Sequence, residues 1–181
     1  MVSLEFTAQQ LHDLLEQLRS RVAERGGRTR MVVVGGAALA LAGDERRVTR
    51  DVDVLPDAQD RVIIMAEAAA MAGEQGLPML WLNDSVRAFS PPIPASDRVR
   101  TDIAGVDLAS DRILAAMKLV AFRVTDLADL ERLFERLGIR SAEEAADLTV
   151  EVYGPDHFCL PERGELFLCA TAILKRRETR T

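Results

Sequence analysis

The sequence predicts an α/β (α+β) fold, in which a small mixed sheet with its helices is followed by a C-terminal part made of helices. Three observations predict it. Apolar residues recur at helical spacing from residue 7 onward and again from residue 111 onward. A continuous β-branched run at 31–34 and an alternation of polar and apolar residues at 51–55 are both typical of strands. Strand and helix patterns alternate early in the chain, and only helix patterns follow residue 110.

Length and composition are those of one ordinary domain, or of a compact core with a helical appendage. The chain has 181 residues, and 48% of them are hydrophobic, which is enough to build a buried core. We expect a core with an N-terminal helix at 1–109 and a helical part packed on it at 110–181. No internal repeat or low-complexity linker lies between them.

Charge and cysteine content argue against several classes of protein. The net charge of −6 disfavours a protein that coats nucleic acid through a general basic surface, but it is compatible with a local basic pocket. Cys159 and Cys169 have no partners at zinc-binding spacing, so we expect reduced thiols. The N-terminus does not resemble a signal peptide, and no apolar run approaches the roughly 20 residues of a membrane span. We therefore expect a cytoplasmic protein.

The first part of the chain reads as a helix followed by two strands with a short helix between them. Residues 7–25 carry one apolar helical face. The continuous β-branched run at 31–34 is typical of a strand buried on both faces. Small residues at 37–42 favour a short helix, and the alternation at 51–55 favours a second strand that Pro56 closes.

The middle of the chain predicts a longer helix, a loop and a strand pair. Alanine and methionine favour a helix at 60–76. The segment 77–89 contains the only tryptophan, and the prolines after it enforce an extended loop. Residues 99–103 and 106–108, separated by Ala104-Gly105, predict a short hairpin or a bent strand pair.

The last part of the chain predicts helices with recognisable start and stop signals. Ser110 is a suitable N-cap for a helix at 111–123, and a second helix follows at 126–138. Ser141 opens a third helix with acids in its first turn. Residues 163–175 predict a final helix before a charged tail.

Two glycines follow the first strand directly. A strand that turns on glycines into a helix leaves backbone N–H groups pointing at whatever lies above the turn, and the helix dipole adds positive charge. Without side chains, Gly35 and Gly36 allow phosphate to approach closely. Paired glycines also serve as plain turns, and the spacing fits neither a dinucleotide-binding fingerprint nor a Walker loop.

Two acids one residue apart open the second strand. Side chains at i and i+2 of a strand project from the same face, so Asp51 and Asp53 lie side by side while Val52 and Val54 face the core. Neighbouring carboxylates repel each other unless a cation lies between them, which favours a hard divalent metal, above all Mg²⁺. The alternative is an exposed strand end whose polar face happens to be acidic.

A phosphate-suited turn, a short helix and a metal-suited strand together predict metal-assisted phosphoryl chemistry. This stretch resembles the core of the DNA-polymerase-β-like nucleotidyltransferase superfamily, whose signature reads here Val34-Gly35-Gly36 and Asp51-Val52-Asp53-Val54. The resemblance implies a polymerase-β-like core, with Asp51 and Asp53 as catalytic metal ligands for Mg²⁺ (or Mn²⁺). It implies Gly35 and Gly36 as the turn that binds the phosphates of an NTP.

More of the chain agrees with one branch of that superfamily. The run Arg47-Val48-Thr49-Arg50-Asp51-Val52-Asp53 resembles the Arg-x-Thr-x-Asp-h-Asp motif of the AbiEii and MenA-like nucleotidyltransferase toxins. The run LAAMKLVAFRVTDLADL resembles their later block, a lysine followed by Asp-h-x-Asp-Leu. WLNDSVRAF and the C-terminal helices resemble a related uncharacterised bacterial nucleotidyltransferase-like family. The resemblance covers roughly residues 30–170.

The resemblance to the toxins assigns further site residues. It implies Arg47 and Thr49 as nucleotide-binding residues, and Lys118 as a catalytic residue that contacts nucleotide phosphate. Asp126 and Asp129 match the following acids, and Asp129 is the better candidate for a catalytic role. From the residues alone, Lys118 is equally a snorkelling lysine at a solvated edge, and the two acids favour a helix N-terminus.

A third carboxylate usually comes from a neighbouring strand in this superfamily. Alternation points Asp102 the same way as Arg100, which makes it the candidate third metal ligand, and Asp107 competes for that role. Alternation alone does not tell which strand lies next to Asp51.

Two features near the acids bear on activity. Arg46, Arg47 and Arg50 are suited to contact phosphates of a nucleotide or an RNA end, and equally suited to balance nearby acids on the surface. Ala37-Ala38 stands where the toxins often have a hydroxyl residue after the glycines, which removes one phosphate hydrogen bond.

The sequence therefore predicts a metal-dependent nucleotidyltransferase that moves NMP from an NTP to an acceptor. The resemblance implies the 3′ end of tRNA as acceptor, and a toxin neutralised by a cognate antitoxin protein. Alternatives are an enzyme of the same fold that modifies a protein hydroxyl or a small molecule, a regulatory module with a degenerate site, and a structural partner in an oligomer.

Overall fold

The computed structural model describes residues 5–44 and 47–179. These residues form five strands and seven α-helices in a mixed α+β arrangement, which confirms the predicted fold class. The chain divides into two compact units. The first comprises the described residues as far as Ala88 together with Arg98–Ala109, and the second comprises Phe89–Asp97 together with the residues from Ser110 onward.

The first unit contains the mixed sheet, with strand order β3-β2-β1-β5-β4. The strands are β1 (Met31–Val33), β2 (Val52–Pro56), β3 (Leu82–Asn83), β4 (Arg98–Arg100) and β5 (Val106–Ala109). β1 pairs antiparallel with β2 and parallel with β5, while β2 and β3 are parallel. β4 and β5 form the predicted antiparallel pair. The central strand β1 is buried along its whole length, as a continuous β-branched run predicts.

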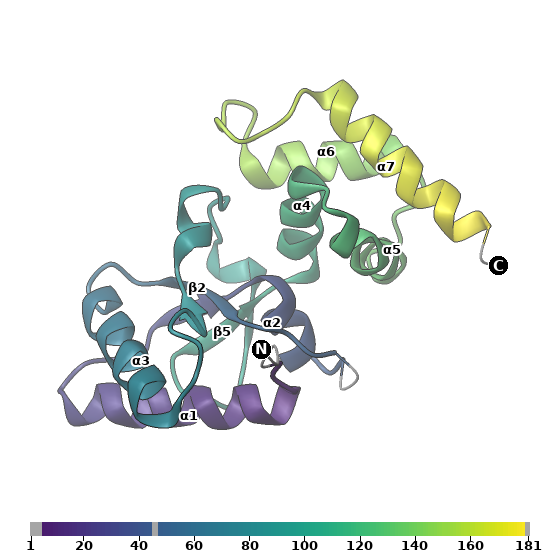
Figure 1. Ribbon diagram of the computed structural model, residues 1–181. Helices are drawn as coiled ribbons and strands as arrows, with labels where there is room; N and C mark the ends of the chain where they lie inside the picture. The colour runs from purple at the N-terminus through teal and green to yellow at the C-terminus, as the bar shows by residue number, and fades with distance from the viewer. Residues whose placement is uncertain (1–4, 45–46, 180–181) are drawn as a thin grey trace. The chain divides into compact units, whose positions relative to one another are not determined.

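Helix α1 (Ala8–Glu24) begins with a reciprocal cap, in which the Thr7 side chain accepts from the Gln10 backbone and the Gln10 side chain accepts from the Thr7 backbone. Its apolar face is completely buried, at Leu11, Leu15, Leu18 and Val22. This face packs against α2 (Gly35–Leu41) and α3 (Arg61–Gln75), and Figure 1 shows α1 in purple at one side of the first unit. α1 therefore belongs to the core of this unit.

Two predicted strand bounds are wrong, since β2 begins at Val52 instead of Asp51 and β4 ends at Arg100 instead of residue 103. Three further details differ from the sequence prediction. α2 begins at Gly35 rather than at residue 37, so the glycines are its first turn. Pro56 is the last residue of β2 and pairs with Met31 of β1. β3 no longer pairs with β2 at this position, so the missing N–H of Pro56 removes no hydrogen bond to β3. The third is β3, which the prediction left out because a strand of two residues has no periodicity of its own.

The second unit is helical. Its helices are α4 (Asp111–Ala121), α5 (Leu127–Arg136), α6 (Ala142–Tyr153) and α7 (Arg163–Glu178), and α6 packs against α4 and α7. The predicted caps Ser110 and Ser141 are both present, since each accepts from the backbone N–H three residues later. No helix in the described parts of the chain is long and apolar enough to cross a membrane.

Candidate functional site

The glycine turn joins β1 to α2 at one end of the sheet. Gly35 has a φ of 65°, a conformation that glycine adopts without strain. A Cβ atom at Gly35 would lie 3.1 Å from Oδ2 of Asp53, closer than side chains normally approach. The backbone N–H of Val34 donates to the Asp53 carbonyl at 2.9 Å, which holds the two strands in this register. The turn therefore lies directly against the Asp53 carboxylate.

Asp53 follows the predicted alternation of β2, whereas Asp51 lies just outside the strand. Val52 and Val54 are completely buried on one face, whereas Asp53 on the other face is half-buried. Asp51 precedes the strand and is exposed. Its backbone carbonyl accepts a hydrogen bond from the Thr49 hydroxyl at 3.1 Å, which fixes the chain just before the acids. The exposed Asp51 and the half-buried Asp53 thus lie at the end of the sheet that carries the glycine turn.

Arg47 and Thr49 lie beside the second glycine. A Cβ atom at Gly36 would lie 3.2 Å from the Thr49 hydroxyl and 3.3 Å from Nη2 of Arg47. The Thr49 backbone is anchored by two hydrogen bonds with the buried Phe6, at 2.7 and 3.1 Å. The structure thus brings together five of the predicted site residues, Gly35, Gly36, Arg47, Thr49 and Asp53, with Asp51 at their border.

The other arginines of this segment do not extend that group. Arg50 is 71% exposed and lies 3.5 Å from the carboxylate of Glu5, so this ion pair balances a surface acid and not Asp51. Arg46 lies outside the described residues.

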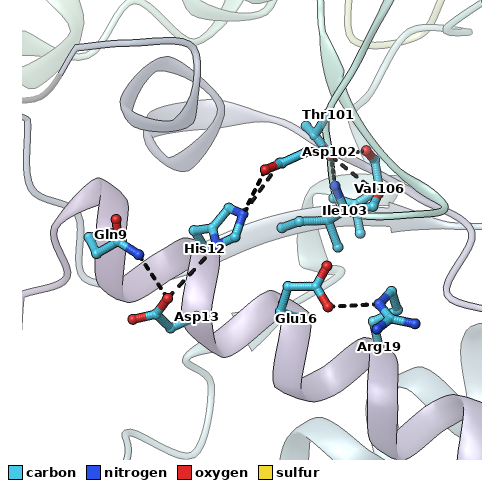
Figure 2. Close-up of polar contacts among 9 residues, drawn as sticks. All are labelled: Gln9, His12, Asp13, Glu16, Arg19, Thr101, Asp102, Ile103 and Val106. Carbon is cyan, nitrogen blue, oxygen red and sulfur yellow. Dashed lines mark hydrogen bonds and ion pairs between the residues drawn. The ribbon is translucent and has the colours of Figure 1, made fainter.

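Asp102 lies away from the glycine turn. Arg100, at the end of β4, pairs with Asp107 of β5, and Asp107 pairs with Val32 of β1. Asp102 follows Arg100 and therefore lies toward the Met31 end of β1. Gly35 and Asp53 lie beyond the opposite end of β1, past Val33. Figure 2 shows its carboxylate facing Nε2 of His12 on α1, at 3.2 Å. The arrangement of the first unit therefore gives no support to Asp102 as a third metal ligand.

Asp107, the competing acid, lies closer to the predicted site but not next to it. It pairs with Val32, which pairs with Leu55 on the same face as Asp53. β1 separates its strand from β2. The strand directly beside Asp53 on the other side is β3, where Asn83 is its register partner.

Asn83 was missed by the sequence prediction. It is buried and belongs to the stretch WLNDSVRAF, two residues after the fully buried Trp81. A polar residue just after the apolar pair Trp81-Leu82 was the available signal, but nothing local showed which strand it would join. Arg61 on α3 donates to the carboxylate of the next residue, Asp84, and this hydrogen bond lowers the pKa of Asp84 below its ordinary value.

Lys118 and Asp129 lie in the second unit, where they meet each other. Nζ of Lys118 is 2.9 Å from the Asp129 carboxylate and 2.5 Å from that of Asp126. The Lys118 side chain is 9% exposed and that of Asp129 4%, so this is a buried cluster and not the solvated lysine of the alternative interpretation. The cluster joins α4 to the start of α5.

The two carboxylates at the glycine turn fit a magnesium ion that is also bound by phosphate and water better than a metal ion bound by protein side chains alone. Among the described residues, no group of three or more histidine, cysteine or acidic side chains is placed to hold a metal. Mg²⁺ is ordinarily bound through one or two carboxylates, with phosphate oxygens and water completing its shell. Asp51 and Asp53, at a turn whose own residues carry no side chains, match that requirement.

Comparison with known proteins identifies the family. A protein-family model described as "Nucleotidyltransferase of unknown function (DUF6036)" matches residues 9–136. The match covers well over half of the chain, from the first turn of α1 to the end of α5. No curated protein and no solved structure shows significant similarity to the chain.

Proposed function

The chain belongs to the DUF6036 family of nucleotidyltransferases of unknown function, and we propose that it transfers NMP from an NTP to an acceptor hydroxyl in a metal-dependent reaction. One observation carries this proposal. The side-chain-free backbone at Gly35 lies against the Asp53 carboxylate, so a phosphate at the turn would lie next to a cation on the acids.

The proposed reaction exchanges one phosphate ester bond for another. The acceptor hydroxyl oxygen forms a bond to the α-phosphorus, and the bond between that phosphorus and the β-phosphate oxygen breaks. Pyrophosphate leaves, and the hydroxyl proton passes to solvent. Asp51 and Asp53 would hold the divalent cation, Mg²⁺ or Mn²⁺, which when bound neutralises charge on the phosphates. The backbone of Gly35 and Gly36 would lie close to the phosphates, because neither residue has a side chain of its own.

The resemblance to the AbiEii and MenA-like toxins supports the finer parts of the proposal. We propose the 3′ end of tRNA as acceptor and a role as the toxin of a toxin–antitoxin pair. Lys118 would contact a nucleotide phosphate, with Asp129 as its partner. An ammonium group has three N–H donors, and among the described residues Lys118 donates a hydrogen bond to Asp126, so donors remain for a phosphate.

The test is a labelling experiment with the whole protein. The protein is incubated with total RNA, Mg²⁺ and each labelled NTP in turn, beside the variants Asp51→Ala and Asp53→Ala. We expect label in small RNA with the unaltered protein and a loss of at least about a hundredfold with either variant, because each removes half of the cation's carboxylate ligands. Omission of Mg²⁺ should abolish labelling.

A matched control is Asp13→Ala, which removes an exposed carboxylate of α1. Among the described residues, this carboxylate accepts a hydrogen bond from Gln9 and lies 3.8 Å from the His12 ring. It should label RNA as the unaltered protein does. Equal labelling by the Asp53→Ala variant would contradict the proposed chemistry. Label in protein or in small molecules, and none in RNA, would favour the alternative acceptors. No transfer from any NTP would favour a degenerate binding module, to which the buried Ala37 and Ala38 already point.

A further inference from the structure

β3 is a short strand that is held rigidly. Trp81, directly before it, is completely buried, and its indole N–H donates to the Ala68 carbonyl of α3 at 2.9 Å. The Trp81 carbonyl accepts from the Val52 N–H at 2.7 Å, which ties the start of β3 to the start of β2. Leu82 is 2% exposed. The side chain that follows is therefore presented from a fixed backbone.

That side chain is Asn83, the register partner of Asp53 on a parallel neighbouring strand. Directly paired residues of adjacent strands project from the same face of a sheet. The carboxamide of Asn83 and the carboxylate of Asp53 therefore lie on the same face, and Asp53 in turn lies against Gly35. Asn83 is the only asparagine of the chain.

The two ends of the Asn83 carboxamide differ in how they are satisfied. Oδ1 accepts from the Ser85 backbone N–H at 3.2 Å and from the Ser85 hydroxyl. Since a backbone N–H is always a donor, this contact fixes which end is oxygen. Nδ2 donates to no residue that the structure describes, and it is not one of the polar atoms sealed from solvent.

Asn83 is only 8% exposed, and a buried amide nitrogen normally has a hydrogen-bond acceptor. The oxygen is already turned toward Ser85, so the N–H groups face away from Ser85. An open donor on an otherwise buried side chain, beside a carboxylate at a glycine turn, is suited to an anionic oxygen of a ligand.

We propose that Asn83 is a substrate-binding residue whose Nδ2 donates a hydrogen bond to the triphosphate of the nucleoside triphosphate at the glycine turn. This inference rests on the proposed function. Ser85 sets the orientation of the amide, and Trp81 fixes the strand that carries it. The sequence analysis expected an acid, Asp102 or Asp107, on the strand next to the acids of the second strand, whereas the residue beside Asp53 is Asn83.

The test measures binding of inorganic triphosphate, and of each of the four NTPs, in the presence of Mg²⁺ by titration calorimetry. Asn83→Asp keeps an oxygen for Ser85 but replaces the donor with a negative charge. We expect its affinity for triphosphate to fall by at least about tenfold, the usual effect of losing a hydrogen bond to a charged group. Asn83→Ala should also weaken binding, with a thermal melt to verify that it is folded.

Two controls separate this role from a structural one. Gln75→Glu makes the same amide-to-acid change at an exposed residue of α3 that bonds to Gln17, and it should bind as the unaltered protein does. Ser85→Ala keeps the backbone N–H that donates to Oδ1 of Asn83. Its affinity for triphosphate should therefore fall less than about threefold, which is less than the effect of losing a hydrogen bond to a charged group.

The outcomes distinguish the two proposals. If the unaltered protein binds triphosphate and Asn83→Asp binds it equally well or more tightly, the role of Asn83 is overturned and the proposed function stands. A variant whose melting temperature falls while its affinity is unchanged leads to the same conclusion, since Asn83 is then only structural. If the unaltered protein binds neither triphosphate nor any NTP, the proposed function fails and the inference fails with it.

Discussion

At the scale of single residues, Gly35 combines two constraints that usually occur apart. Its φ of 65° favours glycine, and the Asp53 carboxylate occupies the space where a Cβ atom would be. Gly76, at the end of α3, has almost the same φ of 66°, but no atom of the described residues lies within 4 Å of its Cβ position. A comparison of substitutions at Gly35 and Gly76 therefore distinguishes the effect of backbone strain from the effect of crowding against Asp53.

The variants Gly35→Ala and Gly76→Ala should each lower the free energy of unfolding by about 1–2 kcal/mol, the usual cost of a left-handed non-glycine residue. Only Gly35→Ala should also reduce nucleotide transfer, because its methyl group displaces the Asp53 carboxylate. Urea unfolding and the RNA-labelling assay measure the two effects. Equal transfer by both variants would show that the Gly35 backbone is not part of the site.

The ion pair between Arg61 and Asp84 should make the stability of the folded protein depend on pH in the acid range. The hydrogen bond from Arg61 lowers the pKa of Asp84 below its ordinary 3.8 in the folded protein. The unfolded chain therefore takes up the proton first, so the stabilisation is complete above pH 3.8 and is lost as the pH falls through the lowered value. Asp84→Asn should be less stable than the unaltered protein at about pH 6, and the difference should shrink below pH 3.8. Urea midpoints across this range measure it, and a constant difference would contradict the assignment.

At the scale of secondary-structure elements, the Lys118 cluster links α4 to α5. Removing the ammonium group takes the nearby cation away from the buried carboxylate of Asp129 and the half-buried carboxylate of Asp126. Lys118→Met should destabilise the protein by about 3 kcal/mol, as expected when one partner of a buried ion pair is lost. Adding Asp129→Asn should recover part of that loss, because one fewer charge stays buried. Urea unfolding measures both variants, and a loss below about 1 kcal/mol in the first would contradict a structural role.

The cap of α6 can be tested without touching the candidate site. The Ser141 hydroxyl accepts from the Glu144 N–H, and the Glu144 carboxylate accepts from the Ser141 N–H. Ser141→Ala should cost about 1 kcal/mol, the typical value of an N-cap. Ser20→Ala, inside α1 and exposed, should be neutral or slightly stabilising, since alanine is the better helix former. Thermal or urea unfolding distinguishes the two variants, and equal effects would argue against the cap.

At the scale of the whole molecule, the second compact unit is built from two separate segments of chain. Phe89–Asp97 lies in it, apart in sequence from the helices it joins. The Ser110 hydroxyl donates to the Asp97 carboxylate at 3.0 Å, and Arg112 donates to it at 3.2 Å. Asp97 thus fastens the first segment to the start of α4.

Asp97→Ala should therefore lower the free energy of unfolding by about 1–3 kcal/mol, the cost of leaving partly buried donors without their charged acceptor. Asp156→Ala removes an exposed acid of the same unit and should change stability by less than about 0.5 kcal/mol. Urea unfolding of the two variants side by side measures the difference. Equal stability would show that the carboxylate of Asp97 is not needed to hold Phe89–Asp97 in place.

Much of the fold was predictable because its signals are local. Caps such as Ser110 and Ser141 and the alternation around Asp53 are properties of a few consecutive residues. Such signals predicted where the helices and most strands lie to within a few residues. β3 was not predictable, because two residues gain their strand conformation only from pairing with β2.

The sequence by itself determined that two glycines follow a buried strand and that Asp53 lies on the face of the next strand opposite to Val52 and Val54. It did not determine which strands are neighbours, because alternation specifies the face of a side chain and not the strand beside it. Only the tertiary structure decided that Asp102 faces His12 at the other end of the sheet, and that Asn83 lies beside Asp53. Strand order is set by the packing of residues far apart in sequence, and no local pattern contains it.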